Sequence, residues 1–492
     1  MRLNALIQGE CLMAFGAPTE AQEVVHLTRS SRNASRGSVF FCIRGSRYDG
    51  HAFARDAYDR GCRVFVAEEE LSLPPDATVL LVLDVRRTMA GMAARFYGEP
   101  AKSLTFIGIT GTKGKTTTAK MSVGLLGGVG ISAAYIGSSG VSYKEVSVPT
   151  ENTTPDSLEL HAWLSAIRDA GIRLVVMEVS SQALVQDRVL GIPFEVGVFT
   201  NLSRDHIGEG EHRTMRDYRA AKLSFFRDHT PKTAILFGED RFSRRIRREM
   251  PRGRCLYYGR HRRSRLFAKD LAEVKARDAF YTEATLVIGR REARVRLAFA
   301  GKHYVDNLLA ALLTVRTVAG CRIEELLPYV GSLSAAGRCE VIPTERAATF
   351  VIDYAHNGAS LAAALRGLRP FTEGHLYCLF GAVGERSECR RRDMARAAAR
   401  YADRSVITED DPGVEDPAHI AAEILAAFPD PGKATVILDR REAIEHLVRV
   451  TTPKDVVLLA GKGDDDFQIT KNGKIPFSEA EILSPFRTSS AT

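Results

Sequence analysis

The chain has 492 residues, of which 45% are hydrophobic and 26% are charged. These proportions exclude a disordered or fibrous protein, and the length suits about three domains of ~150 residues. The net charge of +8 is carried by isolated arginines and short clusters, and it favours anionic ligands. No recognisable nucleic-acid-binding motif accompanies this charge, so we expect no nucleic acid partner.

The eight cysteines include no Cys-x-x-Cys pair, which indicates neither a zinc knuckle nor a disulfide framework. The N-terminal residues lack the long apolar core of a signal peptide, and no later run approaches the ~20 apolar residues that span a bilayer. We therefore expect a cytoplasmic protein with no membrane partner. As a separate expectation, we take the protein to be a monomer.

Short apolar runs separated by helical patterns predict a small α/β domain over residues 1–102. The runs are 38–43, 64–67 and 78–83, and Glu99-Pro100 ends this unit.

A glycine-rich run from Gly108 to Thr117 joins the apolar stretch 104–109 to a helical stretch that begins at Lys115. A strand, a glycine-rich turn and a helix N-terminus in this order are typical of a loop that cradles the phosphates of ATP or GTP. The glycines let backbone N–H groups approach the phosphates, a lysine adds a cation, and a threonine offers a hydroxyl for Mg²⁺. The candidate nucleotide-binding residues here are Gly111, Thr112, Lys113, Gly114, Lys115, Thr116 and Thr117.

Further alternation predicts a mostly parallel, helix-covered sheet in a central domain over residues 103–333. Its later strand-like runs are 174–178, 196–201 and 234–237. Glu178 ends the first of these runs, and His206 follows the second. A carboxylate and an imidazole near the phosphate loop are candidates to hold Mg²⁺.

A third alternation predicts a doubly wound, Rossmann-like sheet over residues 334–492. Its expected strands are 350–354, 376–381, 405–408, 436–438 and 456–460. Loops that follow the strands of an open parallel sheet line one crevice at the carboxyl ends. The loops expected there are 353–358, 381–392, 409–413 and 461–465.

Eight motifs in one order resemble the Mur ligases and, among these, the MurE type. They are Gly108–Thr117, Asn152–Asp156, Met177–Ser181, Asn201–His206, Tyr218–Lys222, Gly337–Glu340, Asp353–His356 and Gly461–Gly463. The resemblance implies a UDP-sugar-binding N-terminal domain, an ATP-binding central domain and an amino-acid-binding C-terminal domain.

The resemblance also implies a reaction in peptidoglycan precursor synthesis. ATP phosphorylates the D-Glu γ-carboxylate of UDP-N-acetylmuramoyl-L-Ala-D-Glu, and the amine of a diamino acid attacks the acyl phosphate. The implied cofactors are ATP and Mg²⁺, together with carbamylation of Lys222 by CO₂. By the same resemblance, the catalytic residues are Lys115, Glu178, His206 and Lys222, and the metal ligands are Thr116, Glu178, His206 and Lys222.

The remaining binding residues are carried over from matching positions. Those facing the nucleotide are Asn307, Arg338 and Asp353. Those facing the UDP-sugar dipeptide are Ser31, Ser46, Arg47, Tyr48, Asn152, Thr153, Thr154, Ser180, Gln186 and Arg188. Those facing the incoming amino acid are Arg391, Asp410, Asp411, Pro412, Gly413, Gly461 and Asp465.

The C-terminal domain departs from the pattern of diaminopimelate enzymes at a position that bears on the choice of amino acid. Those enzymes carry Asp-Asn-Pro-Arg, whose arginine grips the distal carboxylate, whereas here the segment 410–413 ends in Gly413. Asp411, Asp464 and Asp465 add negative charge that suits a bare ammonium. We therefore expect L-lysine as the added residue, with meso-diaminopimelate or ornithine as alternatives.

A displaced cation such as Arg386 or Arg391 could replace the missing arginine of the C-terminal domain. In the central domain, the loop 207–212 is two residues longer than usual.

Two alternatives to this function stay open. Within the superfamily, the chain could catalyse another ligation, such as D-Ala-D-Ala addition or folate polyglutamylation. Outside it, the chain could be a nucleotide-binding homologue without ligase activity.

Overall fold

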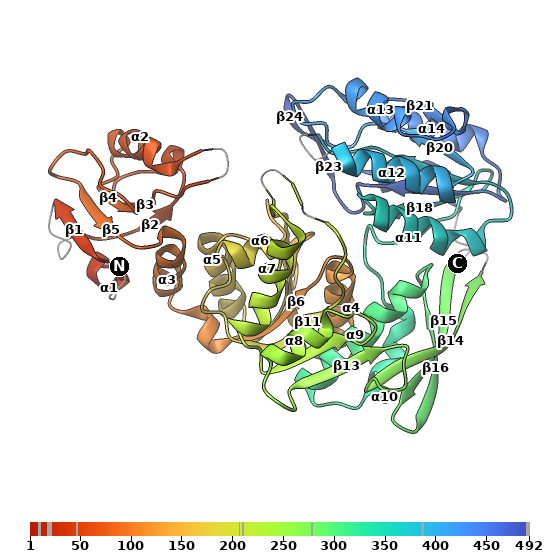
Figure 1. Cartoon of the computed structure of the whole chain (residues 1–492), viewed down its shortest axis with the longest axis horizontal. Helices are drawn as coiled ribbons and strands as arrows, with labels where there is room; N and C mark the ends of the chain where they lie inside the picture. The colour runs from red at the N-terminus through yellow and green to blue at the C-terminus, as the bar shows by residue number, and fades with distance from the viewer. Residues whose placement is uncertain are drawn as a thin grey trace. The chain divides into compact units, whose positions relative to one another are not determined.

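The computed structural model describes residues 1–7, 11–16, 22–45, 48–205, 207–208, 211–276, 279–384 and 388–488. Helices alternate with strands of parallel or mixed sheets, which confirms the α/β class (Figure 1). The chain forms two compact units. The first comprises Met1–Thr112, Ser132–Ala234 and Arg244–Cys255, and the second comprises Lys113–Ile131, Ile235–Ser243 and Leu256–Thr492. Over the described residues, no helix has the length and apolar character needed to cross a bilayer.

The N-terminal sheet has two apolar faces. Its strand order is β1 (Met13–Gly16), β5 (Thr78–Leu81), β4 (Val64–Ala67), β3 (Ser38–Phe41) and β2 (His26–Thr28), with only β1 antiparallel. Val39 and Phe41 share one core with α1 (Leu3–Ile7) and α3 (Val85–Phe96). Phe40 joins a second core with α2 (Ala54–Asp59). Because successive side chains of a strand point to opposite faces, a strand buried on both faces is continuously apolar.

The sheet that follows belongs to the first unit and carries the phosphate loop. Its strands lie in the order β11 (Phe194–Phe199), β6 (Thr105–Thr110), β10 (Leu174–Glu178), β7 (Ala133–Gly137), β8 (Gly140–Tyr143) and β9 (Val146–Val148). The first four are parallel, and β8 and β9 add an antiparallel meander. Ile109 lies opposite both Glu178 and Val198, so β6, β10 and β11 end level with one another. The helices of this region are α5 (Ser157–Asp169), α6 (Ser181–Val185) and α7 (Met215–Arg227).

The second unit begins with the helix after the phosphate loop, α4 (Lys115–Gly128), which packs on α9 (Lys302–Ala319). It also holds β13 (Cys255–Gly259) and an antiparallel trio, β14 (Leu266–Lys275), β15 (Phe280–Ile288) and β16 (Arg291–Leu297). The second unit also holds the short helix α10 (Ile323–Leu326). Two other short elements, β12 (Thr233–Phe237) and α8 (Ser243–Glu249), are each divided along the chain between the two units, and most of α8 belongs to the first. The sequence did not predict the antiparallel hairpins β8–β9 and β14–β16.

The C-terminal sheet is doubly wound, as predicted. Its strand order is β17 (Glu340–Ile342), β18 (Thr349–Asp353), β22 (Val456–Ala460), β19 (Leu376–Phe380), β20 (Arg404–Ile407) and β21 (Ala434–Val436), and only β17 is antiparallel. Its helices are α11 (Gly358–Leu368), α12 (Glu388–Tyr401), α13 (Pro417–Ala426), α14 (Arg440–Val450) and α15 (Glu479–Leu483). A small hairpin, β23 (Phe467–Thr470) and β24 (Gly473–Pro476), completes this part.

Two leucines of the N-terminal part offer a matched test of this core. Leu80 in β5 is 1% exposed, whereas Leu83, just beyond the strand, is 83% exposed. We expect Leu80→Ala to lower the free energy of unfolding by about 2–5 kcal/mol, because it removes buried methyl groups and leaves a cavity. Leu83→Ala should change it by no more than about 0.5 kcal/mol. Urea denaturation of both variants would check this, and equal losses would contradict the described core.

Candidate functional site

The phosphate loop requires glycine at two positions. Gly111 has φ +148° and Gly114 has φ +82°, conformations that L side chains rarely adopt. A Cβ atom at Gly111 would lie 1.9 Å from Thr200 Oγ1, and one at Gly114 would lie 2.5 Å from Asn307 Oδ1. Gly114 is also the N-cap of α4 and has no side chain to cap the first turn, so this helix start suits an anion.

Lys222 on α7 is a buried cation against the backbone of this loop. Its side chain donates from Nζ to the Gly111 carbonyl over 2.8 Å, and the residue is 1% exposed. Its Nζ lies 4.7 Å from the centroid of the Tyr218 ring. The hydroxyl of Tyr218 is 3.0 Å from Thr112 Oγ1, and burial raises the pKa of that phenol. The structure therefore places Lys222, for which the resemblance implies a catalytic role, beside the phosphate loop.

Glu178 has one satisfied and one unsatisfied carboxylate oxygen. Its Oε1 accepts hydrogen bonds from the Tyr135 hydroxyl over 2.7 Å and from the Ser138 N–H over 3.0 Å. Its Oε2 is buried and has no hydrogen-bond partner among the described residues. Leaving a buried carboxylate oxygen unpaired is costly, and Mg²⁺ prefers oxygen ligands, so this atom fits a metal ligand. Thr116 lies in the first turn of α4 in the second unit, and the position of His206 falls outside the described residues.

Several predicted dipeptide-binding residues form one hydrogen-bonded cluster. Thr154 Oγ1 donates to the Glu178 carbonyl over 2.8 Å and accepts from the Ser180 N–H over 3.1 Å. Arg188 Nη1 donates to the Thr154 carbonyl over 2.6 Å, and its Nε and Nη2 donate to Gln186 Oε1 over 3.0 and 2.7 Å. Burial lowers the pKa of Arg188. Hydroxyl, amide and guanidinium groups thus meet at the carboxyl end of β10.

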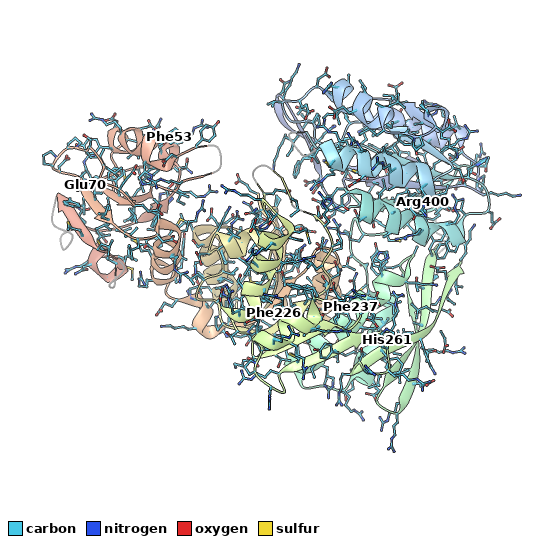
Figure 2. All side chains as sticks on the ribbon, viewed as in Figure 1. Phe53, Glu70, Phe226, Phe237, His261 and Arg400 are labelled. Carbon is cyan, nitrogen blue, oxygen red and sulfur yellow. The ribbon has the colours of Figure 1, made fainter. Side chains whose placement is uncertain are left out.

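The remaining predicted dipeptide residues are placed as follows. Thr153 Oγ1 lies 3.1 Å from Ser138 Oγ, and Asn152 is half-buried one residue before it. Ser31 is buried at the start of a 3₁₀ helix, η2 (Ser31–Asn33), in the N-terminal part. Tyr48 is 72% exposed and packs edge-to-face on Phe53, which Figure 2 labels. Ser46 and Arg47 lie outside the described residues.

Two of the three predicted nucleotide-facing residues lie against the start of α4. Asn307 on α9 lies against Gly114, and Arg338 Nη2 donates to Thr116 Oγ1 over 3.3 Å. Asp353 accepts hydrogen bonds at Oδ2 from the Tyr304 hydroxyl and from the Cys339 N–H, both over 2.9 Å. Burial raises the pKa of Asp353, and the positive charge of Arg338 opposes this rise.

The loops 409–413 and 461–465 are adjacent, as the sequence predicted. A Cβ atom at Gly461 would lie 2.6 Å from Asp410 Oδ2. Lys462 is buried, and its Nζ donates to Asp411 Oδ1 over 2.8 Å. Burial raises the pKa of the Asp410 carboxyl and raises that of Asp465 to about 7. Asp464 pairs with Lys120 of α4 over 2.8 Å. Two of the three aspartates that favoured a lysine substrate therefore already have a protein cation.

The other predicted amino-acid-site residues are also held by the protein. Arg391 is 3% exposed, and its Nη atoms donate to both carboxylate oxygens of Glu415 over 2.8 and 2.7 Å and to Glu423 over 2.7 Å. Binding of a substrate carboxylate by this guanidinium would require these ion pairs to break. Gly413, which follows Pro412, donates its N–H to the Ile469 carbonyl over 3.1 Å. Arg386 lies outside the described residues.

The sequence did not single out several side chains that hold these residues. Tyr135 and Tyr304 each donate to a predicted site carboxylate. His212 is buried, and its Nε2 lies 2.9 Å from Ser181 Oγ. It belongs to the longer loop 207–212, and that extra length was the only signal in the sequence. Lys462 lay inside a recognised motif, but its partner Asp411 could not be inferred from spacing.

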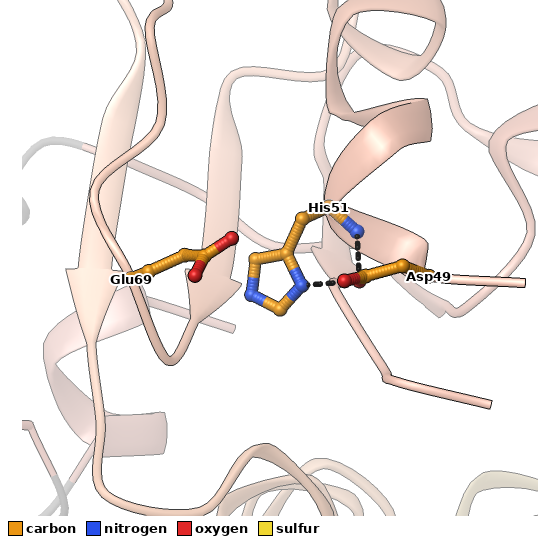
Figure 3. Close-up of side chains that lie close together, drawn as sticks. All are labelled: Asp49, His51 and Glu69. Carbon is orange, nitrogen blue, oxygen red and sulfur yellow. Dashed lines mark hydrogen bonds and ion pairs between the residues drawn. The ribbon is translucent and has the colours of Figure 1, made fainter.

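A histidine and two carboxylates also meet in the N-terminal part. One ligand atom each of Asp49, His51 and Glu69 lie within 4.8 Å of one another (Figure 3). However, His51 Nδ1 lies 2.6 Å from Asp49 Oδ1, and its Nε2 accepts from the Glu68 N–H over 3.3 Å. The guanidinium of Arg44 pairs with Glu69 and Asp49. Because these groups satisfy one another, we interpret the trio as a charge-compensated cluster rather than a metal centre.

Two glycine substitutions test whether the phosphate loop needs the positive φ of Gly114. Gly114 is the N-cap of α4, and Gly127 lies within that helix. We expect Gly114→Ala to raise the KM for ATP by about tenfold or more, because the new Cβ would displace Asn307 and strain a positive φ. Gly127→Ala is the matched control, since nothing lies within 4 Å of its Cβ, and it should leave the KM unchanged and stabilise the helix by up to about 1 kcal/mol. Steady-state ATP kinetics would check this. An unchanged KM in Gly114→Ala would contradict the steric argument.

Comparison with known proteins identifies the family of this chain. Three families match in succession: the Mur ligase family catalytic domain at 23–97, the Mur ligase middle domain at 109–315, and the Mur ligase glutamate ligase domain at 337–463. This succession confirms the predicted three-domain fold class.

Full-length relatives give the same result. The chain is 36% identical over 469 residues to a UDP-N-acetylmuramoyl-L-alanyl-D-glutamate–2,6-diaminopimelate ligase of Geobacillus kaustophilus, covering 94% of each chain. It is 35% identical to the enzyme of that name from Pseudomonas aeruginosa, covering 92% of this chain and 93% of the relative. A solved structure of a ligase with that name superposes with a TM-score of 0.67 at 27% identity, covering 97% of this chain and 98% of the other. The chain therefore belongs to the Mur ligase family of ATP-dependent ligases, as a member of the MurE type.

Proposed function

We propose that this chain joins meso-diaminopimelate to the D-Glu γ-carboxylate of UDP-N-acetylmuramoyl-L-Ala-D-Glu, at the expense of ATP. The relatives at 33–36% identity carry the substrate 2,6-diaminopimelate in their names and match at least 92% of this chain. The observation that carries the proposal within this chain is the pair of buried charged groups beside β6, Lys222 and Glu178. A protein that only bound nucleotide would have no evident use for both.

The proposed chemistry has two steps. A carboxylate oxygen of D-Glu attacks the γ-phosphorus of ATP, and the bond from phosphorus to the β-γ bridging oxygen breaks to release ADP. The neutral amine of the amino acid then attacks the acyl phosphate carbon, and the C–O bond to phosphate breaks after the amine loses its proton. In such reactions the protein chiefly positions reactants and neutralises charge.

Each group of residues has a role in this scheme. Lys115 and the backbone of the phosphate loop bind the β- and γ-phosphates, and the cluster around Thr154 and Arg188 binds the dipeptide. Thr116, Glu178 and His206 would hold Mg²⁺, which when bound neutralises phosphate charge. A carbamylated Lys222 would carry a negative charge and so could orient that metal.

The choice of amino acid differs from the sequence expectation of L-lysine. That expectation used Asp411, Asp464 and Asp465 as a receptor for a side-chain ammonium. Because Lys462 and Lys120 neutralise the first two, this argument loses most of its force. The names of the relatives favour diaminopimelate instead. With Gly413 in place of arginine and Arg391 paired internally, the distal carboxylate of diaminopimelate needs another donor.

The amino acid is tested by phosphate release from ATP in the presence of the UDP-sugar dipeptide. We expect meso-diaminopimelate to stimulate release more strongly than L-lysine, L-ornithine or no amino acid, and mass spectrometry should detect the tripeptide product. Stimulation by lysine or ornithine alone would overturn the choice of diaminopimelate while retaining the ligase. Absence of stimulation by all three would overturn the ligase function.

Carbamylation of Lys222 is tested by substitution and rescue. We expect Lys222→Ala to lower turnover by about 10²-fold or more, because a charged group is lost beside the phosphates, and a small carboxylate such as formate should restore part of it. Lys232→Ala is the control, since this lysine is exposed on the same unit and pairs with Glu195. A ¹³C resonance of carbamate after labelling with bicarbonate gives an independent readout. Full activity in Lys222→Ala would remove this residue from the mechanism.

A further inference from the structure

Arg440 is a deeply buried cation that has not been assigned a role in the reaction. It is the first residue of α14, and its side chain is fully buried. Its Nε and Nη2 pair with Glu479 Oε1 over 2.9 and 2.8 Å. Burying an ion pair removes both charges from water, and this penalty cancels much of the attraction between them. A gain in stability therefore gives a poor account of this arginine.

The other hydrogen bonds of Arg440 reach two functional loops. Its Nη1 donates to the carbonyl of Glu409 over 3.1 Å, and its Nη2 donates to the carbonyl of Ala460 over 2.9 Å. Glu409 precedes Asp410 in the loop after β20, and Ala460 is the last residue of β22, directly before Gly461. One planar guanidinium thus holds the first residue of the loop 409–413 and the residue directly before the loop 461–465, the two loops that carry the proposed amino-acid site.

The segment that carries Arg440 is itself fixed. The side chain of Asp439 caps α14 by accepting from the Glu442 N–H, and the neighbouring Leu438 carbonyl accepts from the Glu409 N–H over 3.1 Å. The charge of Arg440 also opposes the rise in the pKa of Asp410 that burial causes. The segment that carries the arginine is therefore fixed at the start of the loop 409–413.

We propose that Arg440 is a positioning residue for the amino-acid substrate, which sets the spacing of the loops 409–413 and 461–465 without contacting the reactants. The inference rests on the proposed function, because that function identifies these loops as the amino-acid site. The hydrogen bonds of Arg440 do not depend on this identification. Lysine cannot replace this guanidinium, because a single ammonium cannot bond both carbonyls and the carboxylate at these separate points.

The test compares three variants of the full-length enzyme. Arg440→Lys keeps the positive charge and loses the planar guanidinium with its several N–H donors. Glu479→Gln loses the ion pair and leaves Arg440 to bond both carbonyls. Leu447→Ala, at a buried position of the same helix, weakens the domain core at a residue that lies outside both loops.

We expect Arg440→Lys to raise the KM for the amino acid by about tenfold or more, while the KM values for ATP and for the UDP-sugar dipeptide stay close to wild type. Glu479→Gln and Leu447→Ala should leave all three KM values close to wild type, although their Tm falls. An unchanged amino-acid KM in folded Arg440→Lys would overturn the proposal. An equal rise in Leu447→Ala would also overturn it, because general destabilisation would then explain the effect.

Hydrogen exchange provides a readout that does not depend on turnover. Amides of 409–411, 413 and 461–465 should exchange faster in Arg440→Lys than in Leu447→Ala, relative to the rest of the C-terminal part. If the wild-type enzyme is not stimulated by any diamino acid, the proposed function fails, and the exchange comparison still decides whether Arg440 holds the loops. Equal exchange in the two variants would overturn that role.

Discussion

Parallel pairing of strands that end level with one another fixes where the functional groups of this chain lie. Ile109 of β6 is opposite both Glu178 of β10 and Val198 of β11, so the phosphate loop, the dipeptide cluster and the loop after β11 leave the sheet at one edge. The C-terminal sheet repeats this arrangement, because Ala460 is opposite both Asp353 and Phe380. In open parallel sheets, the loops at the carboxyl ends are free to bind ligands, since the ladder already satisfies the strand backbones.

Burial then decides how the charged residues of these loops and of the helices near them are used. Lys462 neutralises Asp411, Arg391 is enclosed by Glu415 and Glu423, and Arg440 pairs with Glu479. A buried charge without a partner is strongly disfavoured, so buried acidic residues are paired with cations of the protein. The number of acidic residues in a loop therefore says little about the electrostatic potential at a bound substrate. Glu178 differs from these residues: tyrosine and backbone donors satisfy only one of its oxygens, and the other has no hydrogen-bond partner among the described residues.

Strands buried on both faces were predictable, because their continuous apolar character is visible in the sequence. The runs 174–178 and 456–460 coincide with β10 and β22, and the helix start at Lys115 coincides with that of α4. The antiparallel strand β16 was missed because four of its seven residues are arginine or glutamate and its first residues are exposed. Such a strand is defined by pairing with β15 rather than by its own composition.

The sequence by itself determined the phosphate loop, the order of the motifs and the family, because glycine conformations and short spacings are encoded by neighbouring residues. Only the tertiary structure decided which charges meet. Asp411 and Lys462 are 51 residues apart, Arg440 and Glu479 are 39 apart, and Arg391 and Glu415 are 24 apart. The attraction between two charges depends on their separation in space and on the burial around them, and no local pattern encodes either quantity. For that reason the acidic loops could be located from the sequence, whereas the ion pairs that neutralise them could not.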